Sequence, residues 1–518
     1  MPLGTLSPEP PRVNLMFILD DSGSMDRDYL PEKTDGNPQY TGNCFGHAAL
    51  NKVFYNPSIK YELPPLADVA SGNYAAPSFS AAWVDGFNSG SKKVNLNTAP
   101  KWSSAGGTQF YYTTYPSSGP TTNCNSLVQV KSLPADQQTN YAIWYSFYRT
   151  RMLMMKSASG RALAGIDASK YRVGFTVINY NGITESDDFH SVGDFDMPLS
   201  ATNPKTHRTA VLEKLYKAAP TGWTPLRPAL VKAGRYFGNG LANQKDPIQY
   251  ICQRNYALLT TDGYWNTAGE PKQGYKPLKV NGTEFGEADG DLNKGAPYQD
   301  AYPYTLADIA HYYYETDLRP DLADMERTIS QDPPKKEVVP QRMHTITLGL
   351  GVSGELTFDP NYTNDSLKSI TWPNPKTSPL DTGSSVIPRI DDLWHAAVNG
   401  RGRYYSAANP NEVVDSLKAA LASANDSSGA ATAAAVSALA PTPGEDQIFV
   451  PAYEFTIDAN QVVTTPWQGD LRAYRLKIDD NGNASVPDLD PKKAEWRAAE
   501  LLDGRTDARS IYFNKGGS

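Results

Sequence analysis

Three oxygen-bearing side chains at alternate positions near the start of the chain could bind a metal ion. Asp20, Ser22 and Ser24 directly follow an apolar run, so a carboxylate and two hydroxyls lie at the end of a predicted buried strand. Hard divalent cations prefer oxygen ligands, and Mg²⁺ keeps several waters. The spacing therefore indicates a divalent cation site, with Mg²⁺ as the expected ion and Ca²⁺ or Mn²⁺ as alternatives.

Two distant segments could complete this site. Thr224 begins a helix as Thr-Pro-Leu, and Asp262 follows the apolar run Tyr256–Thr261. In an open parallel sheet, the loops at the carboxyl ends of the strands gather at one edge, so distant segments can share a site. Each fragment alone is typical of an ordinary turn or helix cap. Their occurrence in order, each at a strand or helix end, favours the metal site.

Short apolar strands alternating with amphipathic helices must position these residues. The strands are predicted at Val13–Leu19, Arg172–Asn179, Tyr256–Thr261 and Met343–Leu350. The helices are predicted at Tyr141–Ala164, Arg208–Ala218, Pro225–Phe237, Leu306–Tyr314, Ile390–Val398 and Glu412–Leu421. This alternation predicts an α/β fold with a doubly wound, mostly parallel sheet that helices cover on both faces.

Three long stretches interrupt the alternation, at about 26–137, 264–304 and 353–388. Loops of this length are usually functional surfaces or small subdomains, so we expect insertions there. An Ala- and Ser-rich run then ends the first predicted domain, 1–440, and a β-rich segment, 441–518, follows it. Strands of antiparallel hairpins are predicted at Gln447–Ile457, Gln461–Pro466 and Leu471–Ile478, with a turn at Asp479–Gly482.

Composition excludes several classes of partner. The formal net charge of −8 repels nucleic acid, and no apolar run approaches the roughly 20 residues of a membrane-spanning helix. The six histidines show neither zinc spacing nor an HExxH pair, and Ser22 lies in no Gly-x-Ser-x-Gly elbow. We therefore predict no catalytic and no cofactor-binding residue. A serine hydrolase that uses Ser22 is a minor alternative.

A second acidic run resembles the start of a calcium-binding loop. Asp289–Asn293 places carboxylates and an amide at alternate positions. The glycine that such a loop needs at its sixth position is missing, since Lys294 stands there, and no suitably placed glutamate follows. We favour an ordinary loop at this point.

The three segments of the candidate site resemble the metal-ion-dependent adhesion site of von Willebrand factor A domains. The resemblance implies that Ser22, Ser24 and Thr224 contact the metal directly, with Asp20 and Asp262 behind them. An acidic group of a ligand would complete the octahedron. Asp21 matches no position of the motif.

A narrower resemblance, to the PilC/PilY family of type IV pilus tip-associated proteins, covers nearly the whole chain. The similar segments are Asn14–Met25, Val53–Pro57, Trp144–Arg151, Thr305–Pro320, His344–Gly351, Asp392–Tyr405 and Trp467–Tyr474. It implies a non-enzymatic protein of pilus adhesion, extension, retraction and surface sensing, with minor pilins, the pilus tip complex or a host surface ligand as partners. We expect an exported protein at the pilus tip, the outer surface or in the periplasm, whose signal peptide has been removed and whose C-terminal propeller is absent here.

The predicted export of the protein affects what we expect of its cysteines, and it separates this prediction from the main alternative function. Cys44 and Cys124 lie in loop-like sequence, so we expect a disulfide between them, and we expect Cys252 to remain a buried thiol. The main alternative is an intracellular A-domain subunit that assembles an ATP-driven complex, as chelatase subunits do. A disulfide or a signal peptide on the gene would exclude it.

Overall fold

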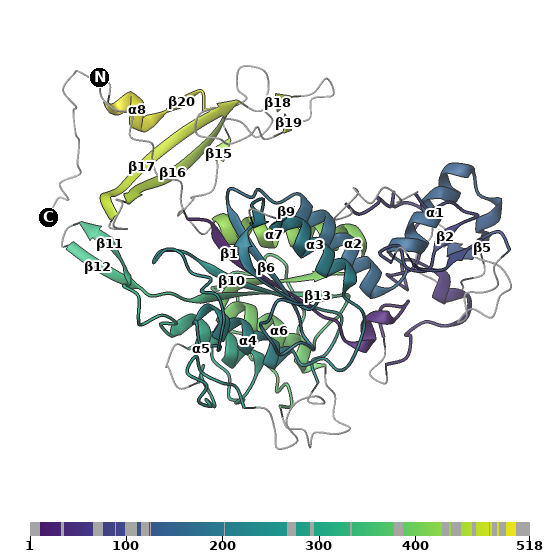
Figure 1. Ribbon diagram of the computed structural model, residues 1–518, viewed down its shortest axis with the longest axis horizontal. Coiled ribbons are helices and arrows are strands. Elements are labelled where there is room, and N and C mark those ends of the chain that lie inside the picture. Colours follow the sequence, from purple (N-terminus) through teal and green to yellow (C-terminus); the bar gives the residue numbers. More distant parts are fainter. Residues whose placement is uncertain are drawn as a thin grey trace. The chain divides into compact units, whose positions relative to one another are not determined.

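Two compact units make up the structure, which is a computed structural model (Figure 1). One unit spans Pro11–Ala424, and the other contains the chain from Asn425 onward. The structure describes residues 11–32, 36–65, 76–88, 90–98, 111–114, 124, 126–200, 203–266, 276–290, 295–331, 334–377, 387–426, 435–436, 447–457, 463–475, 477–478, 484–485 and 494–503.

A six-stranded sheet forms the centre of the first unit, in the order β14-β13-β10-β1-β6-β7. In sequence order its strands are β1 (Val13–Leu19), β6 (Tyr171–Val177), β7 (Phe189–Asp194), β10 (Asn255–Thr261), β13 (Met343–Leu350) and β14 (Arg401–Ala407). All pairs are parallel except β6 with β7. The predicted α/β class with a mostly parallel sheet is therefore confirmed, and β7 and β14 are edge strands that the sequence did not predict.

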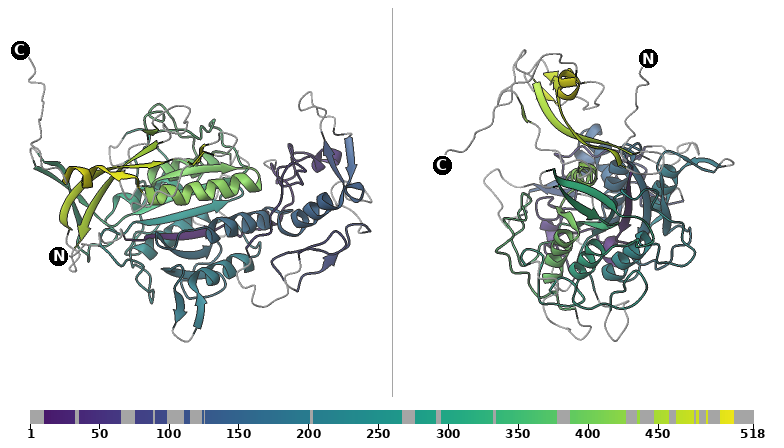
Figure 2. Two further views of the ribbon diagram at one scale, coloured as in Figure 1. Left: turned by 90° about the horizontal axis from the view of Figure 1, so that it is seen from above. Right: turned by 90° about the vertical axis from the view of Figure 1, so that its left-hand side faces the viewer.

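Helices cover both faces of this sheet (Figures 1 and 2). They are α2 (Arg151–Ala164), α3 (His207–Lys217), α4 (Leu226–Phe237), α5 (Leu306–Glu315), α6 (Pro388–Asn399) and α7 (Pro410–Asp426). The first helix, α1 (Ala135–Phe147), contacts α2 and lies away from the sheet (Figure 1). Successive residues of a strand point to opposite faces. Phe17 of β1 accordingly packs in a core with α2, α3 and α7, and Ile18 packs in a second core with α4, α5 and α6.

The single helix predicted at 141–164 is wrong in one respect, because it is two helices. α1 ends at Phe147, and the hydroxyl of Thr150 accepts a hydrogen bond from the backbone N–H of Leu153 at the start of α2. A side chain that caps a helix in this way starts a new helix where apolar periodicity alone continues the old one. The aromatic and Met-rich stripe of this region is buried, as predicted for core packing.

Within the described residues, the first predicted insertion contains short elements before α1 begins. These are the 3₁₀ turns η1 (Gly23–Asp26), η2 (Gly42–Gly46) and η4 (Val130–Ser132) and the strands β2 (Ala82–Trp83), β3 (Lys93–Val94), β4 (Tyr111–Thr114) and β5 (Ser126–Gln129). The predicted disulfide between Cys44 and Cys124 is present. Cys252 is a free thiol as predicted, but it is half-buried rather than buried, because it lies in a turn before β10 and not within the strand.

The other insertions contain no helix or strand within their described residues before α6 begins. Two hairpins lie elsewhere in the first unit: β8 (Pro198–Ser200) with β9 (Asn203–Thr206), and β11 (Met325–Gln331) with β12 (Pro334–Val339).

The second unit is β-rich, as the alternation of apolar and polar residues predicted. β15 (Ala435–Val436), β16 (Gln447–Ile457), β17 (Val463–Arg475) and β20 (Trp496–Arg497) form an antiparallel sheet. β18 (Lys477–Ile478) pairs with β19 (Ala484–Ser485), and α8 spans Ala498–Asp503. The strands predicted at 461–466 and 471–478 differ from the observed ones, since β17 runs through both and a separate β18 follows. The turn predicted at 479–482 lies outside the described residues.

Candidate functional site

The loop after β1 is held at the carboxyl edge of the sheet by hydrogen bonds of the Asp20 backbone and of the Asp20 side chain. Its backbone N–H donates to the carbonyl of Thr260 at 3.2 Å, which continues the pairing of β1 with β10. Its carboxylate accepts from the Ser22 backbone N–H at 2.7 Å and from the Thr261 hydroxyl at 2.6 Å. Asp20 is also fully buried. The hydrogen bonds from Ser22 and from Thr261 at the end of β10 therefore fix its carboxylate in position.

The two serines connect this loop to Asp262, the residue that follows β10. The hydroxyl oxygens of Ser22 and Ser24 lie 2.9 Å apart, and the Ser24 hydroxyl donates to Asp262 Oδ1 at 2.8 Å. Hydrogen bonds therefore connect four predicted site residues from two strand ends: the Ser22 backbone N–H joins Asp20, and the two serine hydroxyls lead to Asp262.

Thr224 lies on a loop directly beside this chain. The Gly23 N–H donates to the Gly222 carbonyl at 3.2 Å, which joins the two loops. Gly222 has a φ of +66°, and a Cβ there would lie 2.8 Å from the Asn179 side chain. The close approach of this loop to Asn179 therefore requires glycine at position 222. The Thr224 hydroxyl accepts a long 3.4 Å hydrogen bond from Asn266, and the neighbouring Trp223 side chain is 57% exposed.

Burial and mutual repulsion perturb the carboxylates of the site. The pKa of Asp20 is raised to about 7, first by burial and then by the nearby charge of Asp262, although hydrogen bonds from Thr261 and Ser22 oppose the shift. Burial likewise raises the pKa of Asp21 to about 6. Asp21 points elsewhere, because its carboxylate accepts hydrogen bonds from Asn179, as expected for a residue outside the motif.

A buried arginine that the sequence did not predict belongs to the site. Arg151, fully buried at the start of α2, pairs with Asp262 Oδ2 at 2.9 Å and with Glu32 Oε2 at 2.8 Å. Its Nε donates to the Tyr29 carbonyl at 2.9 Å, and Arg27 also pairs with Glu32. The sequence offered one signal for this role: Arg151 lies within an aromatic and Met-rich helical stripe that is otherwise typical of core packing. A charged residue in such a stripe is expected to be buried and therefore to need a partner of opposite charge.

The donor set fits a hard divalent cation. It consists of hydroxyl and carboxylate oxygens, without sulfur or imidazole, and Asp20 forms no ion pair with any described residue. A cation beside Asp20 would offset the charge that burial now penalises. The Ser22 hydroxyl lies within hydrogen-bond distance of the Ser24 hydroxyl, and no hydrogen bond joins it to a histidine among the described residues.

Fold and site together define the class: a mixed α/β protein with clustered oxygen side chains at the carboxyl edge of a mostly parallel sheet. No protein-family model matches the chain. The type IV pilus biogenesis factor PilY1 of Pseudomonas aeruginosa strain UCBPP-PA14 is 31% identical over 549 residues, a match that covers 96% of this chain and 44% of that protein. PilY1 of strain PAO1 is 28% identical, with 95% and 44% covered. The chain thus fits a PilY1-like region, which confirms the family predicted from the sequence.

The chain therefore spans less than half the length of the curated relatives that it matches. Among solved structures, the pilus adhesin SpaC from Lactobacillus rhamnosus GG matches with 11% identity and a TM-score of 0.26, over 64% of this chain and 37% of that chain. That similarity is too low to support a conclusion. None of the helices in the described part of the chain combines the length and apolarity needed to cross a bilayer.

Proposed function

We propose that the first unit is a von Willebrand factor A-like domain that binds a divalent cation at a metal-ion-dependent adhesion site. Ser22, Ser24 and Thr224 would contact the metal, and Asp20 and Asp262 would support it directly or through water. The observation that carries this proposal is the hydrogen-bonded connection from Asp20 to the Ser22 backbone N–H and, through the hydroxyls of Ser22 and Ser24, to Asp262. Mg²⁺ suits such a site because it retains waters that carboxylates can bind.

The biological role follows from the relatives. Because they are named type IV pilus biogenesis factors, we infer a non-enzymatic role in pilus assembly, retraction and adhesion, outside the cytoplasm at the pilus tip, cell surface or periplasm. The metal would bind an acidic group of a minor pilin, of another pilus tip component or of a host surface ligand. The buried Arg151 supports this, since its charge offsets Asp262 and leaves a metal-loaded site electropositive.

The intracellular alternative is disfavoured by the disulfide between Cys44 and Cys124, because disulfides persist in oxidising compartments. The hydrolase alternative is not supported, since among the described residues no hydrogen bond joins a histidine to the Ser22 hydroxyl.

Metal-dependent stability tests the proposed site. An ion that binds only the folded state stabilises it by about 2.7 kcal/mol at a hundredfold excess over Kd. Millimolar Mg²⁺ or Mn²⁺ should therefore raise the melting temperature, and a chelator should reverse the rise. Ser24→Ala and Thr224→Ala should lose most of this increment. Asp21→Asn is the matched control, because its amide oxygen can still accept from Asn179 and it lies outside the site.

The pilus role needs a cellular readout. The full-length gene with Ser24→Ala, expressed in a deletion strain of the parent bacterium, should restore fewer surface pili and less surface motility than the gene with Asp21→Asn. Equal restoration by both variants would refute a pilus role for the site. Identical responses of wild type and Ser24→Ala to divalent ions in vitro would refute the metal site itself.

A further inference from the structure

A second group of acidic side chains is buried beside the N-terminus of α5 and the C-terminal half of α6. Ligand atoms of Asp289, Asp300 and His395 lie within 4.8 Å of one another, and so do those of Glu287, Asp289 and Asp308. Asp289 and Asp308 are fully buried. The two groups share Asp289, so three other carboxylates, those of Glu287, Asp300 and Asp308, converge on it.

Hydrogen bonds divide these carboxylates into supporting and available ones. Asp308 caps α5, and its two oxygens together accept four hydrogen bonds, from the N–H groups of Ala288 and Asp289 and from the N–H and hydroxyl of Thr305. A carboxylate has about four acceptor positions, so Asp308 has none left for a metal. Asp289 accepts only one bond on each oxygen, from Asp300 N–H and from the Asn399 amide.

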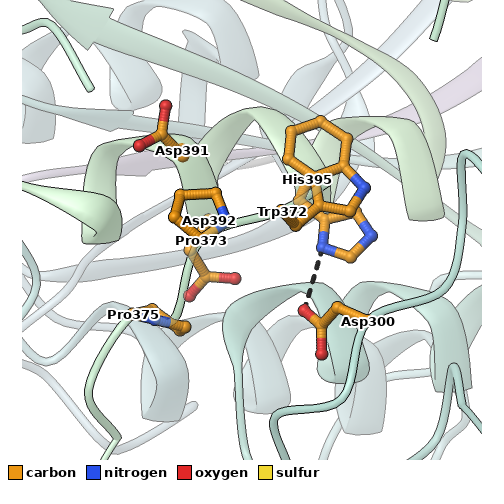
Figure 3. A pocket seen from close by; sticks show the side chains of 7 residues that line it. All are labelled: Asp300, Trp372, Pro373, Pro375, Asp391, Asp392 and His395. Carbon is orange, nitrogen blue, oxygen red and sulfur yellow. Dashed lines mark ion pairs between the residues drawn. The ribbon is translucent and has the colours of Figure 1, made fainter. Parts of the chain in front are cut away.

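The imidazole of His395 is also fully engaged. Its Nε2 lies 3.0 Å from the carbonyl of Tyr298, and its Nδ1 lies 3.2 Å from Asp300 Oδ2. Figure 3 shows this pair, with the indole of Trp372 beside the imidazole. The ligands that remain available are therefore oxygen atoms, which excludes the mixed nitrogen and sulfur donors of a zinc site.

Two further observations point to a bound ion. The amide of Asn399 is fully buried against Asp289, with its nitrogen 2.8 Å from Asp289 Oδ2, yet its Oδ1 has no hydrogen-bond partner within the described structure. Such an orphaned acceptor is costly unless something binds it. In addition, a Cβ on Gly290 would lie 3.2 Å from the Glu287 carboxylate and 3.3 Å from the Asp300 carbonyl, so the absence of a side chain at Gly290 lets both groups approach closely.

No described lysine or arginine pairs with the carboxylates of this cluster, and in the described part of the chain their one ion-pair partner is His395. The pKa of Asp289 is raised to about 10 by burial and by the charges of Asp300 and Asp308, and burial together with Glu287 raises the pKa of Asp308. Buried carboxylates in this situation either take up protons or bind a cation.

We propose that Asp289, together with Glu287, Asp300 and the Oδ1 of Asn399, binds a Ca²⁺ ion. Ca²⁺ accepts carboxylate, amide and carbonyl oxygens in irregular arrangements, whereas Mg²⁺ demands a near-octahedral shell and keeps its waters, which this buried position excludes. The site shares no residue with the proposed adhesion site and does not depend on it.

Terbium luminescence can isolate this second site. Tb³⁺ replaces Ca²⁺ and is sensitised by nearby tryptophans, and Trp372 stacks on His395 with ring centroids 4.3 Å apart. The whole chain with Ser24→Ala, which lacks a ligand of the first site, should still bind one Tb³⁺ that Ca²⁺ displaces. Adding Asp289→Asn should weaken this binding at least tenfold. The introduced amide should fit, because Asn399 can rotate its own amide and accept a hydrogen bond from it.

Asp391→Asn is the matched control in the Ser24→Ala background. Asp391 is a buried carboxylate on α6, the helix that carries Asn399, but it accepts from the N–H groups of Glu355 and Leu356 and lies outside the cluster, so binding should be unchanged. If Asp289→Asn fails to fold, the half-buried Glu287→Gln serves instead. No binding to Ser24→Ala, or equal binding with and without Asp289→Asn or its substitute, would overturn the proposal. Displacement by Zn²⁺ but not by Ca²⁺ would also overturn it.

Discussion

The two buried aspartates of the candidate site, Asp20 and Asp262, are stabilised by different means. Asp262 pairs with Arg151, whereas Asp20 accepts hydrogen bonds only from neutral groups, namely Thr261 and the Ser22 backbone. Asp20 has no counter-ion among the described residues, so a cation that binds there would offset its buried charge. Asp262 is already paired, so its ion pair contributes rigidity to the site. Arg151 therefore acts as a positioning residue that directs Asp262 toward Ser24.

Removing that arginine should strongly destabilise the fold. Arg151→Met leaves Asp262 buried without its partner, and breaking a buried ion pair from one side costs about 3–5 kcal/mol. Urea unfolding in the presence of chelator measures this loss. Arg149→Met is the matched control, because Arg149 is only partly buried and donates to a backbone carbonyl, so its loss should cost under about 1 kcal/mol. Equal losses for both variants would contradict the structural role of the pair.

A buried histidine should make the protein sensitive to acid. The pKa of His207 is lowered from 6.5 to about 4, mainly by burial and then by the charge of His190. The unfolded state therefore binds more protons between pH 4 and 6.5, and stability falls as the pH falls through that window, by up to about 1.4 kcal/mol per pH unit.

His207→Gln tests this link. Glutamine can still donate to the Val173 carbonyl, which His207 Nε2 approaches to 2.6 Å, but it does not titrate. Unfolding free energies at pH 7, 6 and 5 should decline less in this variant than in the wild type. Parallel declines would assign the acid sensitivity to other groups.

At the scale of elements, the sequence predicted what apolar periodicity encodes. β1, β6, β10 and β13 are central strands buried on both faces, so their continuous apolar runs were clear signals. The edge strand β14, Arg401–Ala407, mixes exposed and buried residues and therefore gave no such signal. The break between α1 and α2 depends on one side-chain hydrogen bond, which periodicity cannot detect.

The packing of α4 against α5 depends on a glycine. A Cβ on Gly234 would lie 2.3 Å from the Tyr313 ring, so the helices approach closely only because Gly234 has no side chain. Gly234→Ala should gain about 1 kcal/mol in helix propensity but lose about 1–3 kcal/mol to overpacking, for a net destabilisation. Thermal unfolding checks this. Gly165→Ala, whose Cβ would meet nothing closer than 3.7 Å, should not lower the melting temperature. A stabilised Gly234→Ala would refute the tight contact.

At the scale of the whole molecule, the two carboxylate clusters lie within one unit. Both belong to Pro11–Ala424, and the β-rich unit beyond it supplies no described residue to either. A fragment of residues 11–426, which ends with α7, should therefore fold cooperatively and keep the divalent-cation stabilisation of the full chain. Calorimetry with and without Mg²⁺ would show this. A fragment that unfolds without a transition would show instead that the second unit is needed for folding.

The sequence predicted the two sites unequally. Asp20, Ser22, Ser24 and Asp262 were predicted because each follows a recognisable strand, and the hydrogen bonds join them. At Asp289 the sequence resembled the start of a calcium-binding loop but favoured an ordinary loop, and the cluster itself was not predicted, since its members come from an insertion and from two helices whose tertiary approach no local pattern encodes.

The exposed Trp223 gives the protein a built-in optical reporter. Trp223 is 57% exposed, whereas the other tryptophans whose burial is described are half-buried or buried, so among these it is the most accessible to a soluble quencher such as acrylamide. Because Trp223 directly precedes Thr224, any acidic partner that docks at the metal would shield it. The accessible share of the tryptophan emission should then fall as the partner is added, which permits affinity to be measured without any label.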